Sequence, residues 1–132
     1  MSKFGNVYLI RGDEPLIVSR ELEKLIISLL ENEDKSLVVE ELLEDDYQTD
    51  SEIYSVESLV SAIQTVPFLT RKRIVIGRDF ARFSKKEDLE PLLAYMKDPI
   101  ETNYLILVWE KGAKLQRANQ IPKSLIEAVN GC

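Results

Sequence analysis

Four short runs rich in apolar residues alternate with four amphipathic stretches along this chain, and this order restricts the fold more than any other feature. The apolar runs cover residues 7–10, 37–43, 73–77 and 104–109. After each run, apolar residues recur at intervals of three and four, as in helices that bury one face. Strands that alternate with helices favour a parallel sheet with helices on both faces. We therefore predict a three-layer α/β domain with a mostly parallel sheet.

Local signals indicate where the predicted helices begin and end. Asp13 lies where a residue would cap the first helix. Pro67 is expected to end the second helix, because proline lacks an N–H and disfavours helical geometry in the residue before it. Residues 84–87 have the spacing of a capping box for the third helix. Pro91 suits only a first helical turn, so the start of that helix could instead lie nearer Asp88.

The side chains that the chain lacks exclude several classes of function. It has no histidine, and its one cysteine is Cys132, so internal disulfides, the common His and Cys zinc sites and Ser-His-Asp chemistry are unavailable. No export signal precedes the first apolar run, and no run approaches the ~18 residues needed to cross a bilayer. We expect a cytoplasmic protein with no membrane association, no cofactor or metal and no catalytic residue in this domain.

Charge is distributed unevenly between the two halves of the chain. Residues 1–60 contain 5 Lys and Arg against 15 Asp and Glu, whereas residues 61–132 contain 12 against 8. Such asymmetry can indicate a docking surface or a nucleic-acid patch. An isoelectric point near 4.8 argues against general nucleic-acid binding by the whole domain.

Two charged clusters are candidate binding sites. Acidic residues at 40–41 and 44–46 could hold a hard cation, but their spacing matches no calcium loop, so we favour a solvated acidic loop that continues to residue 52. The basic stretch 71–86 could contact nucleic-acid phosphates, and two aromatic residues lie within it. Charges beside an apolar strand also protect against aggregation, which is the favoured interpretation. The candidate nucleic-acid contacts are Arg71, Lys72, Arg78 and Arg82, and the aromatic residues are Phe80 and Phe83.

Gly12 lies after the first predicted strand and before a helix, where P-loop proteins hold nucleotide phosphates. A phosphate-binding loop needs a second glycine, a lysine for the terminal phosphates and a hydroxyl for magnesium. Here the turn continues with Asp13, Glu14 and Pro15. The two carboxylates repel phosphate, and the proline removes an N–H donor. A glycine that permits a tight turn is therefore the favoured interpretation, with a nucleotide-binding ATPase as an alternative.

Three segments of the chain resemble a known family. Residues 8–15 fit the pattern Y-L-x-x-G-[DE]-[DE]-P, residues 67–75 fit P-F-[FL]-x-x-x-R-[ILV]-V, and an apolar strand follows the Asp-Pro step at 98–99. In this order and spacing, they resemble the N-terminal domain of the delta subunit of the bacterial DNA polymerase III clamp loader. The resemblance covers nearly the whole chain.

The resemblance implies an AAA+-like (P-loop NTPase-like) core whose phosphate loop is degenerate, in agreement with the interpretation of Gly12. In that family a further strand follows the last helix, and two more domains follow the first. We therefore expect residues 1–132 to form a single domain, as a fragment of a longer three-domain subunit.

The resemblance also implies a function and a set of partners. The family's delta subunit binds the ring-shaped sliding clamp (beta subunit) and helps to open it during DNA replication. It is non-catalytic within the polymerase holoenzyme, a nucleotidyltransferase complex. Other expected partners are the gamma/tau and delta prime subunits, through regions outside this chain, and DNA indirectly. By the resemblance, the clamp-binding residues are Gln64, Val66, Pro67, Phe68 and Leu69.

Two features of this segment leave alternatives open. Family members often have leucine where this chain has Pro67, so the backbone of the segment could differ. An aromatic residue after a helix usually packs into its own core, which is the alternative for Phe68. Gln64 and Phe68 together also match the Q-x-x-x-F form of clamp-binding peptides. For the whole chain, a P-loop ATPase and a nucleic-acid-binding module that uses residues 71–86 remain the alternative functions.

Overall fold

The computed structural model describes residues 6–49, 53–113, 115 and 117–131. Strands and helices alternate along these residues, with two short 3-10 helices, η1 and η2, between them. The elements in chain order are β1 (Val7–Arg11), α1 (Pro15–Leu30), α2 (Lys35–Val38), β2 (Val39–Leu42), η1 (Glu44–Tyr47), α3 (Glu57–Ile63), β3 (Arg73–Gly77), η2 (Phe80–Arg82), α4 (Lys86–Met96), β4 (Asn103–Trp109) and α5 (Lys123–Gly131).

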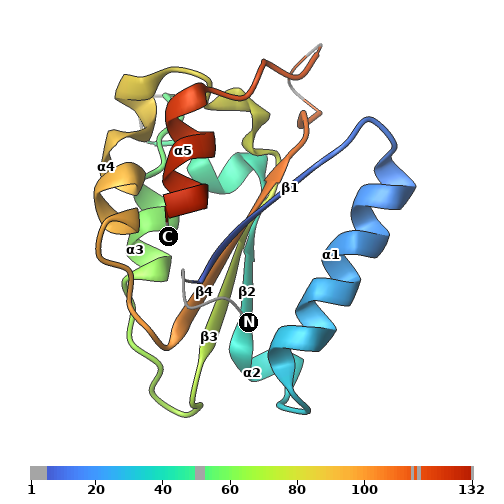
Figure 1. The fold of residues 1–132 in the computed structure, drawn as a ribbon, viewed down its shortest axis with the longest axis vertical. Coiled ribbons are helices and arrows are strands. Elements are labelled where there is room, and N and C mark those ends of the chain that lie inside the picture. The colour runs from blue at the N-terminus through green and yellow to red at the C-terminus, as the bar shows by residue number, and fades with distance from the viewer. Residues whose placement is uncertain (1–5, 50–52, 114, 116, 132) are drawn as a thin grey trace.

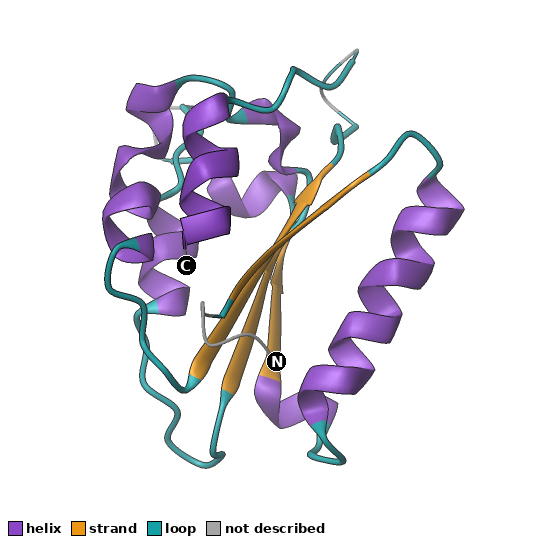
Figure 2. Ribbon diagram, in the orientation of Figure 1, coloured by secondary structure: helices purple, strands orange, loops and turns teal. Residues whose placement is uncertain are grey.

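The four strands form one parallel sheet in the order β1-β4-β3-β2. Helix α1 covers one face of this sheet, and α3, α4 and α5 cover the other (Figure 1; Figure 2). The prediction of a three-layer α/β fold with a parallel sheet is confirmed. All strands enter from the same edge of the sheet, so the loops that precede them share one end of the molecule and those that follow share the other.

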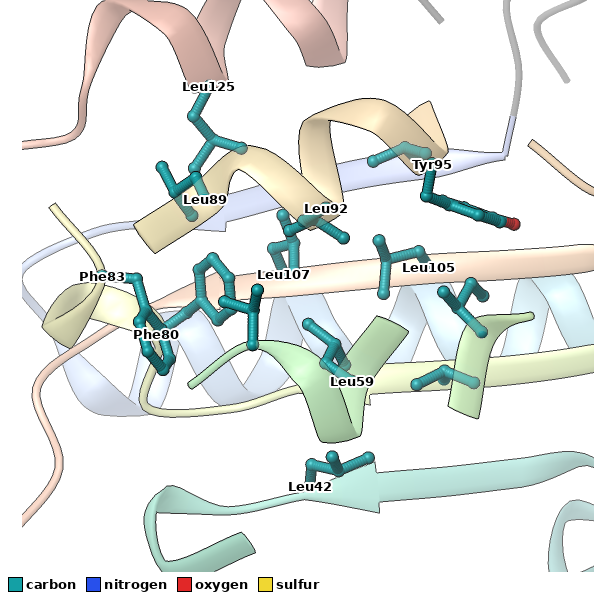
Figure 3. Packing of buried hydrophobic residues seen from close by; sticks show 14 of the residues in the cluster. Leu42, Leu59, Phe80, Phe83, Leu89, Leu92, Tyr95, Leu105, Leu107 and Leu125 are labelled. Atoms are coloured by element: carbon teal, nitrogen blue, oxygen red, sulfur yellow. The ribbon is translucent and has the colours of Figure 1, made fainter. Parts of the chain in front are cut away.

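The two central strands, β3 and β4, direct alternate side chains into two separate cores. Ile74 and Ile76 of β3 pack with the buried face of α1, whereas Val75 packs with the three-helix layer. Leu105 and Leu107 of β4 face the same helices as Val75 (Figure 3). Both strands are therefore continuous apolar runs, as expected for strands buried on both faces.

Several predicted boundaries are wrong. Helix α1 has Glu14 as its N-cap residue and no side-chain cap, so Asp13 does not cap it. The second strand begins at Val39, because Leu37 and Val38 lie in α2, whose first turn is capped by the side chain of Asp34. In a run of only four residues, periodicity alone does not distinguish a helical turn from a strand.

The boundaries of α3 and α4 also differ from the prediction. Helix α3 ends at Ile63, with Gln64 as its C-cap residue, so Pro67 lies beyond the helix and does not end it. Helix α4 begins at Lys86 after Lys85 and has no side-chain cap, so the predicted capping box does not form. Pro91 lies inside α4, where tertiary packing outweighs the loss of a main-chain hydrogen bond.

None of the helices in the part of the chain that the structure describes is both long and apolar enough to cross a membrane.

Candidate functional site

An exposed apolar loop projects from the edge of the sheet where the strands begin. Val66, Pro67, Phe68 and Leu69 follow α3 and precede β3, and we call these four residues the apolar loop (Figure 1). Phe68 is 92% exposed, Leu69 78% and Val66 67%, while Pro67 is half-buried. Phe68 is the most exposed large apolar side chain among the described residues. A contiguous exposed apolar patch indicates an interaction surface rather than a core.

The entry to the apolar loop is fixed by side chains from the sheet. The side-chain amide of Asn103, on β4, donates hydrogen bonds of 2.8 Å to the main-chain oxygens of Ile63 and Thr65. Arg73 Nε, on β3, donates to the main-chain oxygen of Ala62 at 2.9 Å. The last carbonyls of a helix lack partners within the helix. Here the strands supply those partners, so the end of α3 is tied to the sheet.

The exit from the apolar loop is fixed to α1. Lys72 is buried, and its Nζ donates to the main-chain oxygen of Leu29 at 2.7 Å and to the carboxylate of Glu31. The ammonium lies 5.9 Å from the ring centroid of Tyr104. The hydrogen bond from Lys72 lowers the pKa of the Glu31 carboxyl, and the attraction of the two charges adds to this. Both ends of the loop are therefore held while its apolar side chains stay exposed.

The five clamp-binding candidates, residues 64 and 66–69, lie together at this one end of the molecule. Gln64 is exposed beside them, and its main-chain N–H donates to Val60. The alternative in which Phe68 packs into the core of its own domain is wrong, because its side chain is almost fully exposed.

Three of the four candidate nucleic-acid contacts are engaged within the molecule, and only Arg71 is exposed. The buried ammonium of Lys72 binds Glu31 and Leu29, as described above. The guanidinium of Arg78 pairs with Glu110 and Glu41. Arg82 pairs with a glutamate at 2.8 Å, and its guanidinium lies 3.7 Å from the ring centroid of Tyr54.

The aromatic residues of the same stretch are not free to stack on bases. Phe80 and Phe83 are buried and pack against each other and against Tyr47, with ring centroids 5.0 to 6.1 Å apart. The pattern that suggested stacking on single-stranded nucleic acid is therefore part of the core.

Of the acidic candidates at 40–41 and 44–46, Glu44 alone is buried and departs from the expectation of a solvated loop, while the other four are exposed. Glu44 is buried in η1 and pairs with Arg82, and Glu40 and Glu41 pair with Arg73 and Arg78. Residues 50–52 of the predicted loop lie outside the described residues. Within those that the structure describes, no group of His, Cys, Asp and Glu side chains is arranged to hold a metal ion.

The position of a phosphate-binding loop lies at the opposite end of the sheet from the apolar loop. A groove of about 590 Å³ there is lined by Arg11, Gly12, Asp13, Trp109 and Asn119, with four further residues. The φ angle of Gly12 lies outside the left-handed region, so the backbone conformation of this turn does not itself require a glycine. No lysine lines the groove within the described part of the chain.

Sequence reasoning missed the residues that position the apolar loop. Asn103 was not singled out, although a buried polar residue at the start of an apolar strand is an unusual feature. Lys72 was interpreted as a surface charge, although it is only 8% exposed. Asn103 contacts the end of α3, and Lys72 contacts the end of α1. Each of these partners is distant from its residue in the sequence.

Comparisons with known proteins support one family. No curated protein sequence matches the chain. A solved structure, the Bacillus subtilis DNA clamp loader delta protein, superimposes with a TM-score of 0.67 at 19% sequence identity. The match covers 95% of this chain and 37% of that protein, so the chain spans little more than a third of its length. The model of the family described as DNA polymerase III, delta subunit, matches residues 8–130. The chain belongs to the DNA polymerase III delta subunit family.

Proposed function

We propose that this chain binds the ring-shaped sliding clamp of bacterial DNA replication by inserting its apolar loop into an apolar pocket on the ring. The observation that carries the proposal is the 92% exposure of Phe68 on a loop that is fixed at both ends. Membership of the delta subunit family supports the choice of partner, since the similar Bacillus subtilis protein is described as a clamp loader protein.

The physical basis of this binding is the burial of side chains that water surrounds in the free chain. Removing a large apolar side chain from water contributes about 1.5–3 kcal/mol. Phe68 and Leu69 together therefore supply enough free energy to dominate a small interface. The chain contributes binding energy rather than chemistry, and we infer that this energy helps to open the ring.

The remaining partners follow from the same proposal. We expect the gamma/tau and delta prime subunits to assemble with the delta subunit through parts of the protein outside this chain, and DNA to be reached through the assembly. The domain would have an AAA+-like core without a working phosphate loop, and it would act in the cytoplasm, where bacterial DNA is replicated.

Nucleotide binding is less well supported than clamp binding. Asp13 lines the groove at the end of β1, and Glu14 is the N-cap residue of α1, so two acidic residues occupy the turn where a phosphate-binding loop would lie. We expect no heat of binding for magnesium-ATP in calorimetry. A dissociation constant in the low micromolar range, about that of a working nucleotide site, would instead favour the ATPase alternative.

A titration with the cognate sliding clamp tests the proposal. The chain, labelled with a fluorophore far from the apolar loop, should bind the clamp saturably. A short peptide of the Q-x-x-x-F type should then displace it, because both would occupy the same apolar pocket. A chain that does not bind the clamp contradicts the proposal, and binding that the peptide does not affect contradicts the assignment to that pocket.

A further inference from the structure

We propose that Asn103 is a positioning residue. It fixes the apolar loop so that Phe68 is held in its binding position before any partner arrives. The partner in this proposal is the clamp of the proposed function, but the order of the free loop does not depend on that assignment.

The geometry around Asn103 suits this role. The side chain is fully buried at the first position of β4, 40 residues from its first acceptor in the sequence. Its amide group donates to Ile63 and Thr65, one at the end of α3 and the other at the start of the loop. The side-chain oxygen accepts from the hydroxyl of Thr102 at 3.1 Å. All the hydrogen-bonding groups of this buried amide are therefore used.

The apolar loop has few other restraints of its own. Within the described residues, no main-chain hydrogen bond is formed by residues 66–69. Thr65, just before them, bonds back to α3 through its main-chain N–H and its hydroxyl. Arg73 bonds to the helix before this point, at Ala62, and Lys72 holds the chain only after the loop. The two hydrogen bonds from Asn103 are therefore the ones that tie Ile63 and Thr65, where the chain leaves α3, to the sheet.

Order in the free loop has a measurable effect on binding. A loop that must become ordered on binding loses conformational entropy at that step, whereas a loop that is already ordered does not. If one or two residues lose their order, the affinity should fall by about 10- to 100-fold. This loss would occur although Asn103 cannot touch a partner, because the side chain is not exposed.

Asn6 provides a matched control. It is also nearly buried, it lies beside the start of β4, and its side-chain amide donates to the main-chain oxygens of Glu101 and Ile100 at 2.6 and 3.4 Å. Those acceptors belong to the turn before β4 and not to the apolar loop. Asn6→Leu therefore removes the same kind of hydrogen bonds, at the same edge of the sheet, without releasing the apolar loop.

The experiment measures backbone order by NMR relaxation and clamp affinity by titration, on the unsubstituted chain, Asn103→Leu and Asn6→Leu, each well below its melting temperature. In the unsubstituted chain we expect order parameters near the ~0.85 of rigid backbone for Val66, Phe68 and Leu69. Asn103→Leu should lower them below about 0.6 and weaken clamp binding by about 10- to 100-fold. Asn6→Leu should change neither quantity.

Three results overturn the inference: a loop that is already flexible in the unsubstituted chain, an Asn103→Leu variant that keeps its order and affinity, and an equal effect of Asn6→Leu. Should Asn103→Leu not fold, Asn103→Ser, which has one donor in place of two, is measured instead against the same expectations. A chain that binds no clamp contradicts the proposed function alone, and the order parameters still test the role of Asn103.

Discussion

At the scale of single residues, Gly112 has no space for a side chain. A Cβ atom added there would lie 2.4 Å from the carboxyl carbon of Glu44, which is buried and paired with Arg82. Glu44 could move away only by weakening that ion pair, and a buried charge that loses its partner is strongly destabilising. The glycine and the ion pair therefore depend on each other.

Gly112→Ala is expected to lower the free energy of unfolding by about 1–3 kcal/mol, the usual effect of overpacking. Gly12→Ala is the matched control, since its Cβ would meet one methyl group of Val18 at 3.2 Å, a contact that a shift of a few tenths of an ångström relieves. That variant should stay within about 0.5 kcal/mol of the unsubstituted chain. Urea denaturation measures both, and equal effects of the two substitutions would contradict this account of the site.

Asp79 is a second residue with an unfavourable environment. It has a φ of 54°, and its carboxylate accepts a hydrogen bond from the main-chain N–H of Glu44 at 2.9 Å. Burial raises the pKa of the Asp79 carboxyl, and repulsion from the Glu110 and Glu44 carboxylates raises it further, although the hydrogen bond from Glu44 opposes this. The folded protein therefore holds this proton more tightly than the unfolded chain does.

A raised pKa makes ionised Asp79 a destabilising group at neutral pH. The unfavourable contribution is absent below the unfolded pKa, near 3.8, and it develops as the pH rises through the folded pKa. Asp79→Asn should thus stabilise the fold by about 0.5 kcal/mol at pH 7, because asparagine keeps the acceptor and tolerates a positive φ. The difference should vanish in urea denaturations below pH 4. A variant less stable than the parent at pH 7 would show that the charge itself is needed.

At the scale of elements, α4 is unusual in holding a proline in its interior. Pro91 is the sixth residue of this helix and is exposed, so it removes a hydrogen bond to the preceding turn without filling space in the core. The buried face of the helix, which includes Leu89 and Leu92, stabilises it nevertheless (Figure 3).

Pro91→Ala is expected to raise the free energy of unfolding by about 1–3 kcal/mol, because proline is about 3 kcal/mol less favourable than alanine inside a helix. Glu90→Ala, at the neighbouring exposed position, should change stability by no more than about 0.5 kcal/mol. Thermal and urea unfolding test both variants. Loss of stability in Pro91→Ala would mean that α4 needs the bend that proline imposes.

The elements differ in how far their sequences predict them. The runs that became β3 and β4 were identified almost residue by residue, because strands buried on both faces leave an unbroken apolar pattern. Residues 37–38 were assigned to a strand but lie in α2, since the cap from Asp34 decides between two structures that the apolar pattern allows equally. Caps and helix ends depend on single hydrogen bonds, and these are hard to predict from periodicity.

The candidate site was predicted in part. Residues 64 and 66–69 came from a resemblance in sequence, but that resemblance could not give the exposure of Phe68, which depends on contacts made far along the chain. The same holds for Lys72, which is buried through contacts with Leu29 and Glu31. Long-range contacts of this kind cannot be derived from local pattern.

At the scale of the whole molecule, the two ends of the sheet differ in character. Where the strands end, ion pairs join Arg78 to Glu110 and Glu41, and Arg82 to Glu44. Where the strands begin, the apolar loop joins α3 to β3 (Figure 1), and its side chains are exposed between two fixed ends. Ion pairs also lie where the strands begin, between Lys72 and Glu31 and between Arg73 and Glu40. The exposed apolar side chains of the loop are therefore the part of this end that gains most from a partner.

The central claim is that Phe68 is the main anchor for the sliding clamp, and calorimetric titration of Phe68→Ala tests it most directly. Truncating an aromatic anchor typically costs about 2–4 kcal/mol of binding, so affinity should fall by roughly 30- to 700-fold. Stability should stay within about 0.5 kcal/mol, since the side chain is exposed. Ile27→Ala, at an exposed apolar position on α1, should leave clamp affinity unchanged. A Phe68→Ala variant that binds the clamp as tightly as the unsubstituted chain, or an equal loss in Ile27→Ala, would contradict the claim.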